Sequence, residues 1–139
     1  LSIERDEARW FGRADRIEKR EGSVAIVDYK TGALATNEDA AESLQLGYYV
    51  IAARAHPEVA SEGVVSHAEM WFPMHTLKRS IATRSLDVSH LDQIEDRLKA
   101  AAHGISNEDW RPTPGTTCRR CPVRLVCPAV PEGKEAFVS

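Results

Sequence analysis

The alternation of apolar and polar residues predicts a series of strands at the start of the chain. Residues 1–3 are expected to form a first strand, with a turn near residues 6–7. Residues 10–17 place aromatic and β-branched residues between charged ones, a pattern typical of a strand. The Glu-Gly pair at 21–22 then supplies a turn before the apolar run 24–27. We therefore expect a β-hairpin or meander here.

A helix and two further strands are expected next. The predicted helix covers residues 39–55, with acids in its first turn and Pro57 just beyond its end. Residues 64–72 predict a strand that Pro73 ends, and residues 79–86 predict another. The order of strands and helices indicates an α/β fold, with a mixed and mostly antiparallel central sheet flanked by helices.

A second helix gives the clearest periodic pattern in the sequence. Ser89 is expected to be its N-cap and Gly104 its C′ residue. The apolar residues at helical spacing are Leu91, Ile94, Leu98, Ala101 and Ile105. From Trp110 onward, prolines and cysteines replace any periodicity, which indicates a tail without regular structure.

Composition narrows the class of protein. The chain has 139 residues, of which 42% are hydrophobic and 28% charged, as expected for a single globular domain. The net charge of -3 excludes a global basic field but leaves room for a local basic patch. No apolar stretch approaches the ~18 residues of a membrane span. The three cysteines cannot all pair and no signal peptide opens the chain, so we expect a reducing, cytoplasmic compartment.

Two acids and a lysine form the first candidate site. Asp15 lies on one predicted strand and Asp28 near the end of the next, so their carboxylates can meet at one end of the sheet and share Mg²⁺ or Mn²⁺. Lys30 follows Asp28 by two residues and therefore lies on the same face. Spacing alone also permits a simpler interpretation, in which Asp28 begins a turn with Gly32 and the other acid faces solvent.

Three ordered motifs carry a resemblance to a known family. They are G-R-A-D-R-I at 12–17, D-Y-K-T-G at 28–32 and Q-L-G-Y-Y at 45–49. In this order they resemble the RecB-like branch of the PD-(D/E)XK nucleases, most closely the nuclease domains of bacterial helicase-nucleases of the AddAB and AdnAB kind. The resemblance implies a restriction-endonuclease-like core with a C-terminal cysteine-rich loop.

The resemblance also implies roles for individual residues. Asp15 and Asp28 would bind the catalytic Mg²⁺ or Mn²⁺, together with the main-chain carbonyl of Tyr29. Lys30 would support the attacking water.

Gln45 and Tyr49, at i and i+4 on one helix face, would support the active site and DNA. Packing alone also explains Tyr49. The family places a further histidine or glutamate ligand on a helix that would precede Leu1, and the sequence starts there without a methionine. We therefore expect a segment of a longer protein.

The C-terminal cysteines form a second candidate site. Cys118, Cys121 and Cys127 give the spacing C-x2-C-x5-C. Thiolates favour zinc or an iron-sulfur cluster, and three of them need a fourth ligand. Spacing does not separate a cluster from a zinc ion completed by His103 or another histidine. The resemblance implies a [4Fe-4S] cluster whose fourth cysteine lies upstream of Leu1.

Arginines near both candidate sites can contact DNA. Residues 111–130 contain four arginines and no acid, and Arg119 and Arg120 lie between two of the cysteines. These arginines can equally compensate thiolate charge. Arg13 and Arg16 flank Asp15, where they can bind the DNA backbone or pair with nearby acids.

Together these expectations describe a metal-dependent DNA exonuclease domain. Residues 1–109 would be the nuclease core, lacking its N-terminal helix, and residues 110–139 a cysteine-rich tail packed on it. The resemblance implies single-stranded DNA or duplex ends as substrate, a helicase domain in the same polypeptide, a second helicase-nuclease subunit, and recombinational repair. A non-catalytic DNA-binding scaffold and a stand-alone CRISPR-associated exonuclease remain as alternatives.

Overall fold

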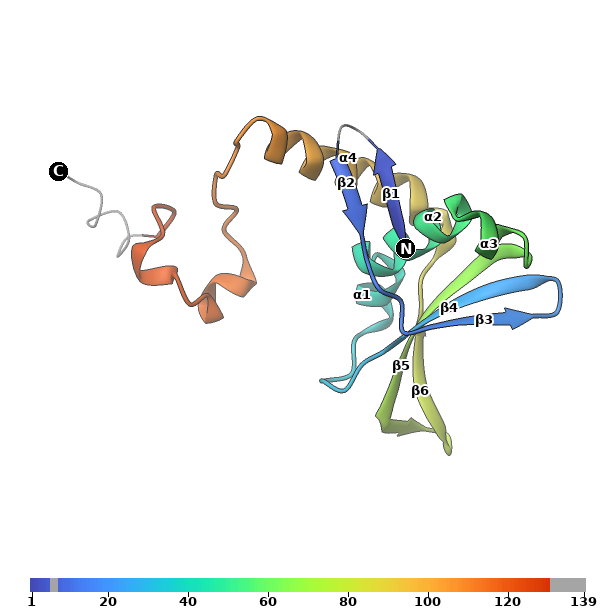
Figure 1. Cartoon of the computed structure of the whole chain (residues 1–139). Coiled ribbons are helices and arrows are strands. Elements are labelled where there is room, and N and C mark those ends of the chain that lie inside the picture. Colours follow the sequence, from blue (N-terminus) through green and yellow to red (C-terminus); the bar gives the residue numbers. More distant parts are fainter. Residues whose placement is uncertain (6–7, 131–139) are drawn as a thin grey trace. The chain divides into compact units, whose positions relative to one another are not determined.

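A four-stranded mixed sheet forms the centre of the first part of the chain (Figure 1). The computed structural model describes residues 1–5 and 8–130, so the turn expected near residues 6–7 lies outside the described residues. In spatial order the strands are β3 (Arg16–Arg20), β4 (Ser23–Tyr29), β5 (Val64–Leu77) and β6 (Ser80–Ser85). Only β4 and β5 are parallel, and the other neighbours are antiparallel. The predicted mixed, mostly antiparallel sheet is confirmed.

The strand expected at residues 10–17 does not exist as one element. Strand β2 (Ala8–Phe11) pairs with β1 (Ser2–Arg5) in a separate two-stranded sheet, and β3 starts only at Arg16. Between them the chain passes close over two tyrosine rings, since a Cβ at Gly12 would lie 2.6 Å from Cε1 of Tyr48. This close approach, rather than strand pairing, determines the path of residues 12–15.

The helix expected at residues 39–55 is divided in two. Helix α1 covers Asn37–Ala41 and helix α2 covers Leu44–Ala55. Ser43 separates them because its side chain accepts a hydrogen bond from the N–H of Leu46, as an N-cap does. A short helix α3 (Pro57–Ala60) follows. With α3, α2 forms the crossover that two parallel neighbours such as β4 and β5 require.

Strand β5 is longer than the sequence predicts. It does not end at Pro73 but continues to Leu77, with a register shift between Phe72 and Thr76. Proline has no N–H to donate to the ladder, so the strand bulges there and resumes pairing at Thr76 with Ile81.

Helix α4 (Leu91–Ser106) follows a short 3-10 turn, η1 (Val88–His90). Ser89 is not its N-cap. Its N–H instead donates to the carboxylate of Asp87 at 2.9 Å, which caps the 3-10 turn. Gly104 lies inside the helix rather than beyond its end. Within the described residues, no helix is both long and apolar enough to cross a membrane.

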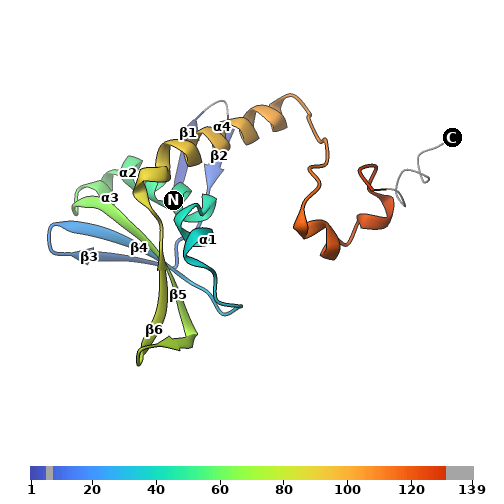
Figure 2. The same ribbon diagram turned by 180° about the vertical axis from the view of Figure 1, so that it is seen from behind.

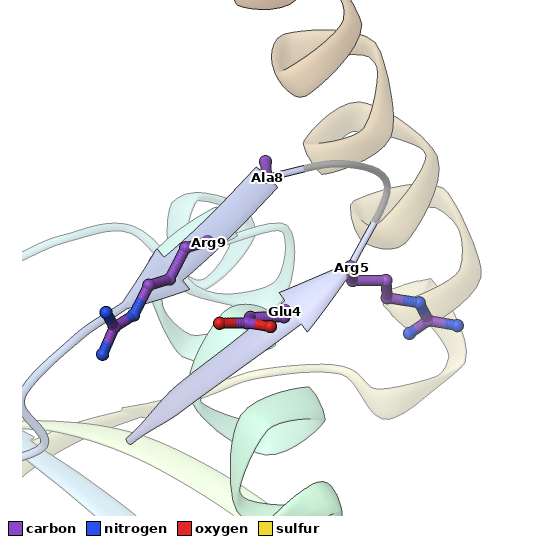
Figure 3. A pocket seen from close by; sticks show the side chains of 4 residues that line it. All are labelled: Glu4, Arg5, Ala8 and Arg9. Carbon is purple, nitrogen blue, oxygen red and sulfur yellow. The ribbon is translucent and has the colours of Figure 1, made fainter.

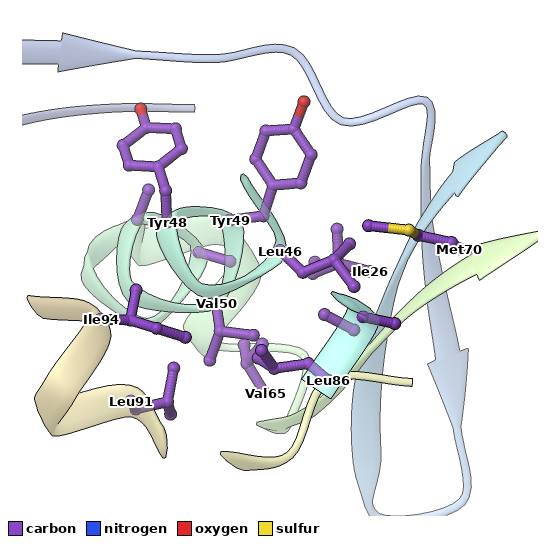
Figure 4. Close-up of a cluster of buried hydrophobic side chains, with 14 of the residues drawn as sticks. Ile26, Leu46, Tyr48, Tyr49, Val50, Val65, Met70, Leu86, Leu91 and Ile94 are labelled. Carbon is purple, nitrogen blue, oxygen red and sulfur yellow. The ribbon is translucent and has the colours of Figure 1, made fainter. Parts of the chain in front are cut away.

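The hydrophobic core lies between the sheet and the helices (Figure 4). Helix α2 packs on β4 and β5, and α4 approaches α2 where Gly47 leaves room for Ile94. The largest fully buried side chains are Phe72, Ile26, Leu46, Ile94, Val24, Val27, Val50 and Val65. Helix α2 is therefore packed on both sides, and its residues are held in fixed positions.

An ion pair crosses the other face of the sheet. Arg20 on β3 binds both carboxylate oxygens of Glu69 on β5, at 2.9 and 3.0 Å. The indole N–H of Trp71 donates to the same carboxylate at 2.8 Å. These contacts, above all the hydrogen bond from Arg20, hold the pKa of Glu69 below its usual value.

Glu69 should therefore make stability depend on pH at the acid end. A carboxyl group whose pKa is lower in the folded state stabilises the protein above its unfolded-state pKa, and this contribution is lost as pH falls through the folded-state value. Glu69→Gln should flatten the decrease in the free energy of unfolding below about pH 5. Urea denaturation of both proteins at pH 7, 5 and 4 measures this, and equal slopes against pH would contradict it.

A second compact unit runs from Gly104 onward. After the end of α4, its described residues contain only two short 3-10 turns, η2 (Thr116–Arg120) and η3 (Arg124–Val126). The three cysteines lie in and beside these turns, all reduced and partly exposed. This agrees with the lack of periodicity in the sequence after Trp110.

Candidate active site

Asp28 lies at the end of the most deeply buried strand. The preceding residues of β4 are fully buried, and Asp28 itself is only 4% exposed. Among the described residues it is the one buried polar or charged side chain. Burying a carboxylate is costly unless it is paired or bound to a metal, so its partners define the site.

Lys30 and Gln45 are these partners. The ammonium Nζ of Lys30 lies 2.6 Å from Oδ2 of Asp28, and the amide Nε2 of Gln45 donates to Oδ1 at 3.2 Å. Lys30 also donates to Oε1 of Gln45 at 2.7 Å. Oδ2 of Asp28 has no hydrogen bond of good geometry although it is buried. The carboxylate therefore keeps lone pairs for a further cation.

Tyr49 fixes the orientation of Gln45. Nε2 of Gln45 also donates to the hydroxyl oxygen of Tyr49 at 3.0 Å, and this hydroxyl donates to the main-chain carbonyl of Arg13 at 2.8 Å. The i and i+4 residues of α2 thus act together, as the sequence predicts. Tyr49 is also packed in the core, and Figure 4 shows its ring pointing from α2 toward the chain that follows β2. The packing and hydrogen-bonding interpretations both hold.

Asp15 reaches the same end of β4 from a turn. It does not lie in a strand, as expected, but in the segment just before β3. Its Oδ2 accepts a hydrogen bond from the main-chain N–H of Tyr29 at 2.8 Å. The second carboxylate is therefore held beside the backbone that joins Asp28 to Lys30.

The residues gathered here suit a hard divalent cation. Mg²⁺ takes only one or two carboxylates from a protein and completes its shell with water and phosphate oxygens. Asp15 and Asp28 supply two carboxylates, and the buried, incompletely bonded Oδ2 of Asp28 supplies an open ligand position. The described residues contain no group of three or more histidine, cysteine or acidic side chains that could hold a metal ion.

The arginines near Asp15 have different environments. The side chain of Arg13 is exposed, and its carbonyl is the acceptor for Tyr49. Arg16 pairs with Glu18 at 3.2 Å, and its guanidinium lies 6.0 Å from the ring centroid of Trp71. Arg13 is thus directly available to a ligand, whereas Arg16 already has partners within the protein.

The cysteines in the second unit do not form a metal site in the described structure. Cys118, Cys121 and Cys127 are close in sequence, and the N–H of Gly115 donates to Sγ of Cys118 at 3.3 Å. The structure does not gather the three thiols of this described segment into a metal-binding group. The neighbouring Arg119 and Arg120 are exposed. A cluster here remains a prediction from spacing and resemblance.

A separate pocket lies on the β1–β2 hairpin (Figure 3). Its lining residues are Glu4, Arg5, Ala8 and Arg9. Arg5 forms an ion pair with Glu95 of α4. None of the predicted site residues lines this pocket, so it plays no part in the site around Asp28.

Sequence reasoning missed the role of Gly12. A Cβ at this position would lie 2.6 Å from Tyr48 and 2.9 Å from Tyr49. A glycine just before Arg13 was the available signal, because glycine often marks a close approach of the backbone to another group. Its absent side chain lets the chain carrying Asp15 rest on the tyrosine that orients Gln45.

Comparison with known proteins agrees with this geometry. A family model described as the PD-(D/E)XK nuclease superfamily matches residues 6–128 of the chain. Searches of curated proteins and of solved structures found no match.

Proposed function

Because the chain belongs to the PD-(D/E)XK nuclease superfamily, we propose that it hydrolyses DNA phosphodiester bonds at Asp15, Asp28 and Lys30. The observation that carries this proposal is the buried carboxylate of Asp28, bonded on one side by Lys30 and Gln45 and incompletely bonded at Oδ2. A purely structural carboxylate at the end of a strand would be exposed or fully hydrogen-bonded.

The residues of the chain divide the work of hydrolysis. Asp15, Asp28 and the main-chain carbonyl of Tyr29 would hold Mg²⁺ or Mn²⁺, which lowers the pKa of a bound water and stabilises charge on a phosphoryl oxygen. Lys30 is half-buried, so its ammonium can donate both to Asp28 and to a water or phosphate oxygen in solvent. Gln45 holds this ammonium in place, and Tyr49 holds Gln45.

The finer assignment follows the order of the three motifs. We propose a RecB-like exonuclease domain of a helicase-nuclease of the AddAB or AdnAB kind, which acts in the cytoplasm on single-stranded DNA or duplex ends during recombinational repair. Its partners would be a helicase domain in the same polypeptide and a second helicase-nuclease subunit. The intact contacts among Asp28, Lys30 and Gln45 favour a catalytic domain over a non-catalytic scaffold.

We also propose a [4Fe-4S] cluster on Cys118, Cys121 and Cys127 with a fourth cysteine from outside this sequence. This rests on the C-x2-C-x5-C spacing and the resemblance, and no catalytic step depends on it. Anaerobic purification of a protein extended upstream should give about four iron atoms per chain. Zinc in place of iron, or no bound metal, would contradict the cluster.

The nuclease proposal is tested by cleavage of end-labelled single-stranded DNA. Cleavage should require Mg²⁺ or Mn²⁺ and stop when EDTA removes the metal. The chain should be compared with a version extended upstream, because the family carries a further metal ligand there. If the extended, folded protein leaves DNA intact at millimolar metal, the nuclease proposal is wrong.

Gln45 should act as a positioning residue. Gln45→Met keeps the volume of the side chain but removes its bonds to Lys30, Asp28 and Tyr49. We expect cleavage to fall roughly 10- to 100-fold and the metal concentration for half-maximal rate to rise, since outer-shell partners orient metal ligands.

Stability should hardly change, because Gln45 is exposed. The matched control is Gln93→Met on an exposed part of α4, which should cleave like the wild type. Equal metal dependence of Gln45→Met and the wild type would show that Gln45 does not position the site.

A further inference from the structure

The end of the β5–β6 hairpin forms an arm that the proposed site does not use. We define the hairpin arm as residues 73–81. It starts at the bulge after Phe72 and includes the turn between Leu77 and Ser80. Figures 1 and 2 both show this end of the hairpin extending away from the helices. The arm is thus available to a partner outside the domain.

The charge of the arm contrasts with that of the whole chain. Residues 70–86 contain Lys78, Arg79 and Arg84 but no acidic residue, although the protein carries a net charge of -3. Arg84 is bonded to the carbonyl of Ala35, whereas no acid in the described part of the chain pairs with either basic residue at the tip. Two unneutralised cations therefore lie at the exposed end.

The backbone at the tip is strained. Lys78 and Arg79 have φ angles of 49° and 68°, in the left-handed region that ordinary residues avoid. A two-residue hairpin turn with positive φ at both positions normally carries Asn-Gly. Two long cationic side chains occupy these positions instead. Such strain is kept where the side chains have a use.

Apolar side chains surround these cations. Met74 is 76% exposed, and Leu77 and Ile81 are each 45% exposed. A DNA strand offers phosphates for the cations and apolar faces of sugars and bases for these side chains. The combination therefore suits DNA better than a purely polar ligand.

The base of the arm is joined to the candidate active site. The ring Nε2 of His75 lies 3.0 Å from the carbonyl oxygen of Gly32, two residues beyond Lys30. The main-chain N–H of Lys30 donates to the carbonyl of Trp71 at 2.8 Å. At about 3.3 Å per residue, Lys78 lies roughly 20 Å from this point, the length of about six nucleotides of a duplex strand.

We propose that the hairpin arm binds the DNA strand that enters the Asp28–Lys30 site. Lys78 and Arg79 contact phosphates about six nucleotides from the scissile bond, and the exposed apolar residues contact sugars or bases. This inference rests on the proposed function and specifies which element holds the substrate.

The test removes the charges but keeps the turn. In the double variant Lys78→Asn/Arg79→Gly, the new residues favour the same turn geometry, so the hairpin should remain folded. The charge-matched control is Lys19→Gln/Lys99→Gln, at two exposed lysines outside the arm. Fluorescence anisotropy in EDTA then measures binding of labelled single-stranded DNA of 4 or ~20 nucleotides over a salt series.

For the longer DNA, the arm variant should bind roughly tenfold more weakly at low salt, and its slope of log K against log salt should fall by about 1.4, or ~0.7 per phosphate. The control and the short DNA should show no such change. An unchanged salt slope, or an equal loss in the control, would overturn the proposal and leave the arm to another partner.

Binding and cleavage separate the two proposals. If the wild type cleaves DNA but the arm variant binds like the wild type, the nuclease proposal stands and the arm proposal is wrong. If the extended protein does not cleave but binding still depends on the arm, the arm proposal stands and the nuclease proposal is wrong.

Discussion

Asp28→Asn should lower the rate of DNA cleavage at least ~1,000-fold, equivalent to about 4 kcal/mol of transition-state stabilisation. The amide keeps the size of the side chain and an oxygen for Gln45, but it removes the negative charge that would bind the divalent cation. The fold should survive, because replacing one member of a buried ion pair is tolerated when the partner reaches solvent, and Lys30 is only half-buried.

Two readouts separate loss of metal from loss of structure. Mg²⁺ should raise the melting temperature of the wild type but not of Asp28→Asn, since a ligand stabilises only a protein that binds it. Asp96→Asn, at an exposed acid on α4, is the matched control and should retain both the metal effect and cleavage. Cleavage by Asp28→Asn within tenfold of the wild type would exclude this carboxylate from the chemistry.

Gly47→Ala should destabilise the protein by about 1–3 kcal/mol, although alanine is the better helix former. An added Cβ would lie 2.5 Å from Cγ2 and 2.8 Å from Cδ1 of Ile94, which is almost completely buried. Ile94→Ala alone should cost about 2–5 kcal/mol because it leaves a cavity.

The double variant tests whether these two residues compete for the same space. Gly47→Ala/Ile94→Ala should be more stable than the sum of the single effects predicts, by about 1–2 kcal/mol, as urea denaturation measures. Gly104→Ala is the control, since no heavy atom lies closer than 4.0 Å to its added Cβ. It should be neutral or slightly stabilising. Additive effects at the first pair would mean that α4 moves away from α2 without cost.

The sequence was sufficient for the features that depend on local patterns. The spacing of Asp28 and Lys30 predicted that they share a face, and the i and i+4 spacing of Gln45 and Tyr49 predicted that they act together. Both predictions agree with the observed contacts. The mixed sheet also followed from the order of apolar segments.

Other features depend on contacts between distant residues and gave no local signal. The strand expected at residues 10–17 is interrupted because Gly12 rests on the rings of α2. Strand β5 continues past Pro73 because β6 can pair again beyond the bulge. Whether the three cysteines hold a cluster depends on a fourth ligand that no local pattern supplies, so this part stays a prediction.

The bond from the N–H of Lys30 to the carbonyl of Trp71 has a consequence for synthesis of the protein. Asp28, Lys30, Gln45 and Tyr49 all leave the ribosome before β5 exists. Parallel pairing of β4 with β5 is a long-range contact, which forms late compared with local structure. A nascent chain that has not reached residue 71 therefore carries every catalytic side chain without an assembled site, and its ability to cut nucleic acid should appear only when β5 has joined the sheet.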